Sequence, residues 1–163
     1  MKYIIQYGTA LIILAISSFS AWYEGSAIRD YPSEWKYTAL YSKMMHGDVT
    51  TPGDISQLDH FIYAAKFHPF FPIFMALSMS YLLLISGVKY LKHRPNMRMS
   101  FFLILAAIHL LLFQLVSASP TAGGQTFTIT FMILGMVHLL LAFMIYIRSK
   151  KEDRLEEDPI LTK

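Results

Sequence analysis

The chain has 163 residues, of which 55% are hydrophobic and only 15% are charged, and its net charge is +3. Soluble domains carry charge on about a quarter of their residues, so this composition predicts a protein that is largely buried in lipid. The absence of cysteine excludes disulfides, thiolate metal sites, iron–sulfur clusters and cysteine nucleophiles.

Four segments without a charged residue are long enough to cross a bilayer, which requires about 20 apolar helical residues. They cover residues 3–22, 70–88, 100–117 and 127–147. Open sheet edges cannot face lipid, so each segment is expected to be a helix. The predicted fold is an all-α, antiparallel bundle of four transmembrane helices within residues 1–148, followed by a charged cytoplasmic tail at 149–163.

The distribution of lysine and arginine predicts how these segments are threaded through the membrane. The connection between the second and third segments contains Lys89, Lys92, Arg94 and Arg98. The tail begins with Arg148, Lys150, Lys151 and Arg154, whereas residues 118–126 carry no charge. Basic residues stay on the cytoplasmic side, so both termini are expected inside and residues 23–69 outside. Basic residues that flank apolar segments also indicate the lipid bilayer, not nucleic acid, as the partner.

The first segment has a second interpretation as a cleaved signal peptide. It follows a single basic residue, Lys2, and it ends with Ser18, Phe19 and Ser20 before Ala21, which suits signal peptidase. Cleavage there would remove one helix of the bundle and place the new N-terminus outside.

Residues 23–69, which we call the cap, are too many for an unstructured connection. Aromatic and aliphatic residues at 22–29 and 35–43 predict two strands. The turn-forming Asp30-Tyr31-Pro32-Ser33 lies between them, so a β-hairpin is expected.

The second part of the cap is expected to be an amphipathic helix, which begins at Asp54 or Ser56 and ends near Phe67. Its expected apolar face consists of Ile55, Leu58, Ile62 and Ala65. The other faces carry Asp59, His60, Tyr63 and Lys66.

A short motif directly after the first segment reads Ala21-Trp22-Tyr23-Glu24-Gly25-Ser26, and Glu34-Trp35-Lys36-Tyr37 follows it. These residues resemble a family of small Gram-positive bacterial membrane proteins of unknown function, marked by an AWYEGS motif. The resemblance implies a location in the bacterial plasma membrane. The order of the elements is also similar to the claudin-like arrangement, as an analogy of shape only, because the paired cysteines of claudins are absent.

The motif directs attention to Glu24, where the first segment meets the outer surface. Its carboxylate could ligate a cation or hold a partner, or it could simply pair with Arg29 or Lys36 or accept backbone N–H groups. The aromatic residues around it are typical of an interfacial belt. We expect a partner-binding or structural role for this region, through Trp22, Tyr23, Glu24, Gly25, Ser26 and Trp35.

Two histidines, His109 and His138, lie within the third and fourth segments. Each is nine residues from the cytoplasmic end of its segment, so both are expected about 13 Å above that boundary. One hypothesis is ligation of a b-type haem, the single cofactor considered, with quinone-linked electron transfer. A second is a proton relay. A third is that the two imidazoles only form hydrogen bonds between packed helices.

Outside the membrane, histidines at 46, 60 and 68 together with Asp54 and Asp59 could form a zinc site. No two of them have the spacing of four residues that places ligands on one helical turn. We therefore expect ordinary loop residues here, no metal site and no catalytic residue.

The preferred functional hypothesis is a non-enzymatic membrane protein whose cap binds another envelope protein or a second copy of the chain. One alternative is a redox or proton-transfer subunit that uses His109 and His138. A second alternative is a lipid-modifying enzyme that uses Glu24.

Overall fold

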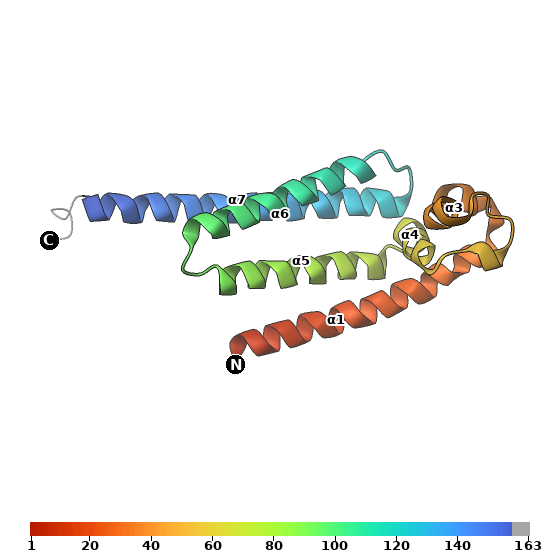
Figure 1. The fold of residues 1–163 in the computed structure, drawn as a ribbon, viewed down its shortest axis with the longest axis horizontal. Helices are drawn as coiled ribbons and strands as arrows, with labels where there is room; N and C mark the ends of the chain where they lie inside the picture. The colour runs from red at the N-terminus through yellow and green to blue at the C-terminus, as the bar shows by residue number, and fades with distance from the viewer. Residues whose placement is uncertain (158–163) are drawn as a thin grey trace. The chain divides into compact units, whose positions relative to one another are not determined.

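The structure, a computed structural model, describes residues 1–157 and is helical throughout its regular elements (Figure 1). The long helices are α1 (Lys2–Gly25), α4 (Gln57–Phe67), α5 (Phe70–Tyr90), α6 (Pro95–Val116) and α7 (Ala122–Glu157). The shorter ones are α2 (Trp35–Thr38), α3 (Leu40–His46) and the 3₁₀ turns η1 (Ser26–Asp30), η2 (Pro32–Glu34) and η3 (Pro52–Asp54). Of the predicted tail, residues 158–163 lie outside the described residues.

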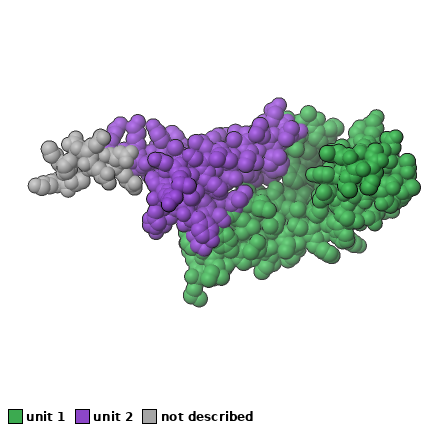
Figure 2. All heavy atoms as spheres, viewed as in Figure 1, with its two compact units in different colours: residues 1–82, 116–127 green, residues 83–115, 128–163 purple. Residues whose placement is uncertain are grey.

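The chain forms two compact units, which Figure 2 distinguishes by colour. Unit 1 contains residues 1–82 and 116–127, and therefore α1, the cap and the first part of α5. Unit 2 contains residues 83–115 and the described part of 128–163, and therefore the end of α5, most of α6 and most of α7.

Four of the helices are long and apolar enough to cross a membrane, as the sequence predicts. They cover Lys2–Asp30, Phe70–Tyr90, Pro95–Val116 and Ala122–Lys151, and their apolar windows have mean hydropathies between 1.7 and 2.4. The helices extend beyond the predicted segments because polar residues at their ends continue the helical backbone. Pro95 begins α6, where a missing N–H costs little. The alternative cleavage site before Ala21 lies within the continuous helix α1.

The cap is the part of the fold that differs from the prediction, because its described residues contain no strand. Helix α1 continues through the first expected strand to Gly25, and Pro32 then starts a helical turn. The second expected strand is replaced by α2 and α3. Burial there recurs at Trp35, Thr38, Ala39 and Ser42, which is the spacing of a helix and not the alternation of a strand. The strand component of the claudin-like analogy is therefore not found in these residues.

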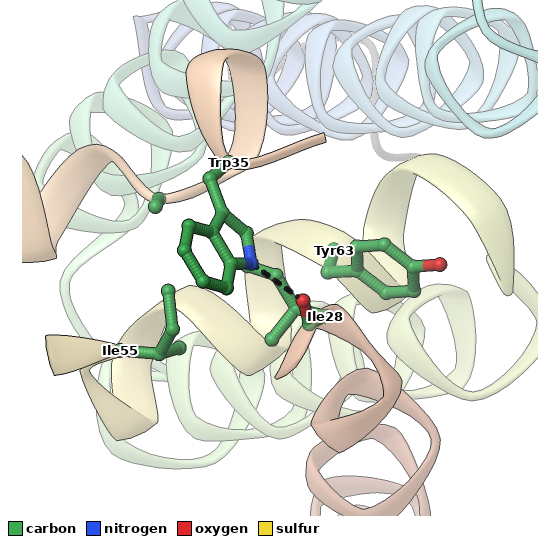
Figure 3. Close-up of a cluster of buried hydrophobic side chains, with 5 residues drawn as sticks. Ile28, Trp35, Ile55 and Tyr63 are labelled. Carbon is green, nitrogen blue, oxygen red and sulfur yellow. Dashed lines mark hydrogen bonds between the residues drawn. The ribbon is translucent and has the colours of Figure 1, made fainter. Parts of the chain in front are cut away.

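A small apolar core holds the cap together (Figure 3). Its buried residues come from η1, α2, α4 and the segments between them: Ile28, Trp35, Ala39, Ile55 and Tyr63. The indole Nε1–H of Trp35 donates a hydrogen bond of 2.7 Å to the carbonyl of Ile28, so the ring is anchored by a polar contact as well as by packing.

Helix α4 buries residues that the sequence predicts to lie off its apolar face. Asp59, His60, Tyr63 and Ala64 are all buried, whereas Leu58 is 51% exposed. The predicted apolar face was wrong at Leu58, because the contacts of α4 enclose polar residues next to it in the helix. In this protein the polar residues of α4 are instead in contact with α1 and α3.

Small residues allow α1 to approach α4 closely. Ser17, Ala21 and Gly25 recur every four residues and are buried on one side of α1. A Cβ atom at Gly25 would lie only 1.9 Å from the carbonyl oxygen of His60, so the two backbones are nearly in contact. Only glycine fits such an approach, which resembles the close helix crossings of membrane proteins.

Unit 2 is held together by its own apolar contacts. Phe102, Leu105 and Ala142 form its buried cluster, in which α6 packs on α7. Gly135 of α7 lies directly against Leu110 of α6, because a Cβ atom there would be 2.9 Å from Leu110 Cδ2.

We predict that Gly25→Ala destabilises the cap by about 1–3 kcal/mol, since the added methyl group forces α1 and α4 apart. The two tryptophans of the chain, Trp22 and Trp35, both report on this region, so thermal unfolding followed by tryptophan fluorescence measures the effect. Gly8→Ala is the matched control, because nothing lies within 4 Å of the added Cβ atom. Equal unfolding midpoints for the two variants would contradict the assigned close contact.

Candidate functional site

Two charged side chains of α4 organise the short helices of the cap. The buried carboxylate of Asp59 accepts hydrogen bonds from the backbone N–H groups of Tyr41 and Ser42, both at 2.8 Å, and from the Ser42 hydroxyl. These N–H groups belong to the first turn of α3, where no helical acceptor is available. The Lys66 ammonium donates to the carbonyl of Tyr37. Asp59 and Lys66 therefore hold α2 and α3 against α4.

The start of α4 is also fixed by local hydrogen bonds. Ser56 precedes the helix, and its hydroxyl accepts from the N–H of Leu58 at 3.3 Å. Asp54 instead belongs to η3, where it accepts from the N–H groups of Thr50 and Thr51. These backbone hydrogen bonds lower the pKa of the Asp54 carboxyl group. Of the two expected helix-starting residues, Ser56 has that role.

His60 is enclosed at the contact between α1 and α4. Its side chain is 1% exposed, and both ring nitrogens are buried without a hydrogen-bond partner. The ring lies beside Trp22, with centroids 5.9 Å apart. Burial lowers the pKa of His60, and the positive charge of Arg29 lowers it further, whereas the nearby Trp22 carbonyl and the Asp59 carboxylate raise it. The ring is therefore held in its neutral form.

The residues considered for a zinc site are separated by this arrangement. His46 and His68 are exposed, His60 is enclosed, and both carboxylates are occupied by the hydrogen bonds described above. Within residues 1–157, apart from the side chains the structure leaves undescribed, no three histidine or acidic side chains come close enough to share a metal ion.

The residues of the Ala21–Ser26 motif have different environments. The Trp22 indole donates to the side chain of Gln57 at 2.7 Å, and the Ser26 hydroxyl donates to the carbonyl of Tyr23 at 2.7 Å. Tyr23 itself is exposed, whereas Gly25 is buried in the contact with α4. Most of the motif therefore builds the junction between α1 and the cap.

Glu24 and Trp35, the other two candidates near the outer surface, are both partly or fully enclosed. Glu24 is half-buried, and its Oε2 atom is buried without a hydrogen-bond partner. Trp35 is only 7% exposed and belongs to the core of the cap. Trp35 thus positions the cap from inside and does not offer its ring to a partner.

The structure brings His109 and His138 together inside unit 2. The rings are stacked, with centroids 4.9 Å apart and planes inclined by 14°. Each Nδ1 lies within hydrogen-bond distance of a carbonyl on its own helix, 2.7 Å for Leu105 and 2.6 Å for Leu134. A carbonyl oxygen can only accept, so each Nδ1 carries a proton and donates in these contacts. The Nε2 atom of His138 is buried without a partner.

A haem bound by these histidines would lie between them, because axial ligands approach iron from opposite faces of the macrocycle. The rings are in direct contact here, so α6 and α7 would first have to separate. The haem and proton-relay roles of His109 and His138 stay predictions.

A further candidate surface lies on the short helices of the cap, where the sequence predicts that Tyr37 and Tyr41 extend an aromatic surface. Large apolar side chains of α2 and α3 recur at intervals of three and one residues and are exposed: Tyr37, Leu40, Tyr41, Met44 and Met45. The small and polar residues Thr38, Ala39 and Ser42 between them are buried. We call the exposed group the apolar cap face. Its helical spacing was visible in the sequence but was interpreted as a strand.

We predict that the cap loses stability as the pH falls below about 6.5, the value at which an unfolded histidine takes up a proton. The folded protein resists protonation of His60, so lower pH favours the unfolded chain, and above that value the stabilisation is complete. Unfolding midpoints from tryptophan fluorescence between pH 5 and pH 8 measure the slope. It should diminish in His60→Phe and persist in His46→Gln, a variant of an exposed histidine. An unchanged slope in His60→Phe would assign the effect to another group.

Comparison with known proteins places the chain in a family. Residues 4–91, which include α1, the cap and α5, match the domain of unknown function DUF4306. The chain is also similar to the uncharacterized protein YjdJ of Bacillus subtilis (strain 168), with 37% identity over 82 residues, which is 49% of this chain and 75% of that protein. No solved structure matches it. These relatives agree with the Gram-positive family of unknown function expected from the sequence, and the chain belongs to the DUF4306 family.

Proposed function

We propose that this chain is a non-enzymatic, multi-pass protein of the bacterial plasma membrane whose external cap binds a second envelope protein. The membrane part of the proposal is supported by the exposure of the four long helices. At most 28% of the residues in any of their apolar windows are buried within the protein. Such a large apolar surface is unfavourable in water and is stabilised when hydrocarbon covers it.

The charge distribution supports an orientation with both termini in the cytoplasm. Residues 89–98 and 148–151 contain basic residues and no acidic one, whereas residues 118–126 are uncharged. The cap contains acidic and basic residues in similar numbers. Because basic residues are retained on the cytoplasmic side, this distribution supports an external cap.

The apolar cap face carries the proposal of a protein partner. Aromatic residues and methionine are enriched in the centres of protein interfaces. Helix α3 rests on α4 through its Ser42 side, so the apolar cap face is directed away from α4. The apolar cap face belongs to the connection between the candidate spans Lys2–Asp30 and Phe70–Tyr90, which this proposal puts outside the membrane, so a protein is favoured over lipid as its partner.

The alternatives receive less support from the geometry. A redox subunit would use His109 and His138, whose rings are stacked against each other and not spaced for a macrocycle. A lipid-modifying enzyme would use Glu24 with a nearby histidine. His60, whose backbone lies against Gly25 next to Glu24 in the chain, is enclosed and unavailable to a substrate.

We predict that a photo-crosslinking amino acid at Met44, which is 83% exposed, captures a discrete protein in native membranes. The same group at Ser33, an exposed residue of the cap outside the apolar cap face, should capture none. Leu40→Glu should abolish the Met44 adduct, because it places a charge in the contact, while tryptophan fluorescence shows an intact cap.

The mass of the adduct identifies the partner, and an adduct of twice the mass of the chain would indicate a second copy. No adduct at Met44, or an adduct that persists in Leu40→Glu, would contradict the proposal.

A further inference from the structure

A cavity of about 300 Å³ lies in unit 2, where the first turn of α6 faces the part of α7 that follows its apolar segment. It is separate from the stacked histidines and from the cap. Its lining residues are Pro95, Asn96, Met99, Ile145, Tyr146, Ser149 and Lys150.

The lining of this cavity has two chemical parts. Met99 and Ile145 provide an apolar wall that continues into the membrane-spanning parts of α6 and α7. Asn96, Ser149 and Lys150 provide hydrogen-bond donors, and the Lys150 ammonium lies 5.8 Å from the centre of the Tyr146 ring. A ligand that fits both parts has a polar head and a hydrocarbon chain.

The charge around the cavity favours an anion. None of the residues that line the cavity is acidic, and Lys150 is one of them. Arg98, outside the lining, lies one helical turn from Pro95, and the first acidic residues of this part of the chain, Glu152 and Asp153, follow Lys151. The Nε atom of Arg98 is buried without a hydrogen-bond partner. In the first turn of α6, Pro95 has no N–H and the N–H of Arg98 donates to the carbonyl of Arg94, so the N–H groups of Asn96 and Met97 are the ones without an acceptor within the helix.

We propose that this cavity binds the phosphate headgroup of an anionic phospholipid, with an acyl chain along Met99 and Ile145. Basic cavities between membrane helices are suited to such headgroups. The inference rests on the membrane location proposed above but not on the partner of the cap, so either can fail without the other.

The experiment uses the purified full chain in detergent, with lipid binding measured by native mass spectrometry. Phosphatidylglycerol is titrated against phosphatidylcholine, which has the same acyl chains and no net charge. The protein should retain phosphatidylglycerol preferentially.

Two variants test the cavity. Ser149→Leu fills it without changing the charge and should weaken the binding of phosphatidylglycerol about tenfold. Lys150→Gln should weaken it by a similar factor.

Lys92→Gln is the matched control, because it removes one positive charge from an exposed residue outside the cavity. Its affinity should stay within about threefold of the unchanged protein. Equal losses in Lys92→Gln and Ser149→Leu, or no loss in Ser149→Leu, would overturn the proposal in favour of general surface attraction. Displacement of the lipid by inorganic phosphate at equal concentration would overturn the assignment to a lipid. Circular dichroism checks that each variant keeps its helices.

Discussion

The fold of the cap depends on the close approach of α1 to α4, where Gly25 lies against the backbone of His60. This contact directs the polar side of α4 inward, so that Asp59 becomes buried next to α3. A buried carboxylate must be hydrogen-bonded, and the first turn of α3 supplies the donors. With α3 held by its small and polar residues, its large apolar residues are left facing outward. The proposed interaction surface is thus a consequence of one crossing between two helices.

The four apolar helices could be predicted from the sequence because the signal is local. A segment of about 20 apolar residues without charge predicts a helix long and apolar enough to cross a membrane, whatever its neighbours are. The cap could not be predicted in the same way, because its aromatic and aliphatic residues fit a strand as well as a helix, and only the contacts decide between them. The buried face of α4 was missed for a related reason, since Asp59 and His60 are polar but are enclosed by α1 and α3.

For the candidate sites, too, the sequence predicts local positions but not the contacts between helices. Residue counting predicts equal depths for His109 and His138, and the structure places their rings in contact. Their stacking depends on how each helix is rotated about its axis. The sequence does not indicate this rotation, because α6 and α7 carry apolar residues on every face.

The family match ends at residue 91 and therefore covers the cap, while the proposed lipid cavity lies beyond it. The two proposals accordingly rest on different parts of the chain.

The most direct test of the account is the accessibility of single cysteines, which the natural absence of cysteine makes possible. Met45→Cys places a thiol on the apolar cap face, and Lys92→Cys places one in the basic connection between α5 and α6. The account predicts that a membrane-impermeant maleimide labels Met45→Cys in intact cells and labels Lys92→Cys only after permeabilisation. Labelling of Lys92→Cys in intact cells, or protection of Met45→Cys until the membrane is opened, would contradict an external cap on a membrane-spanning protein.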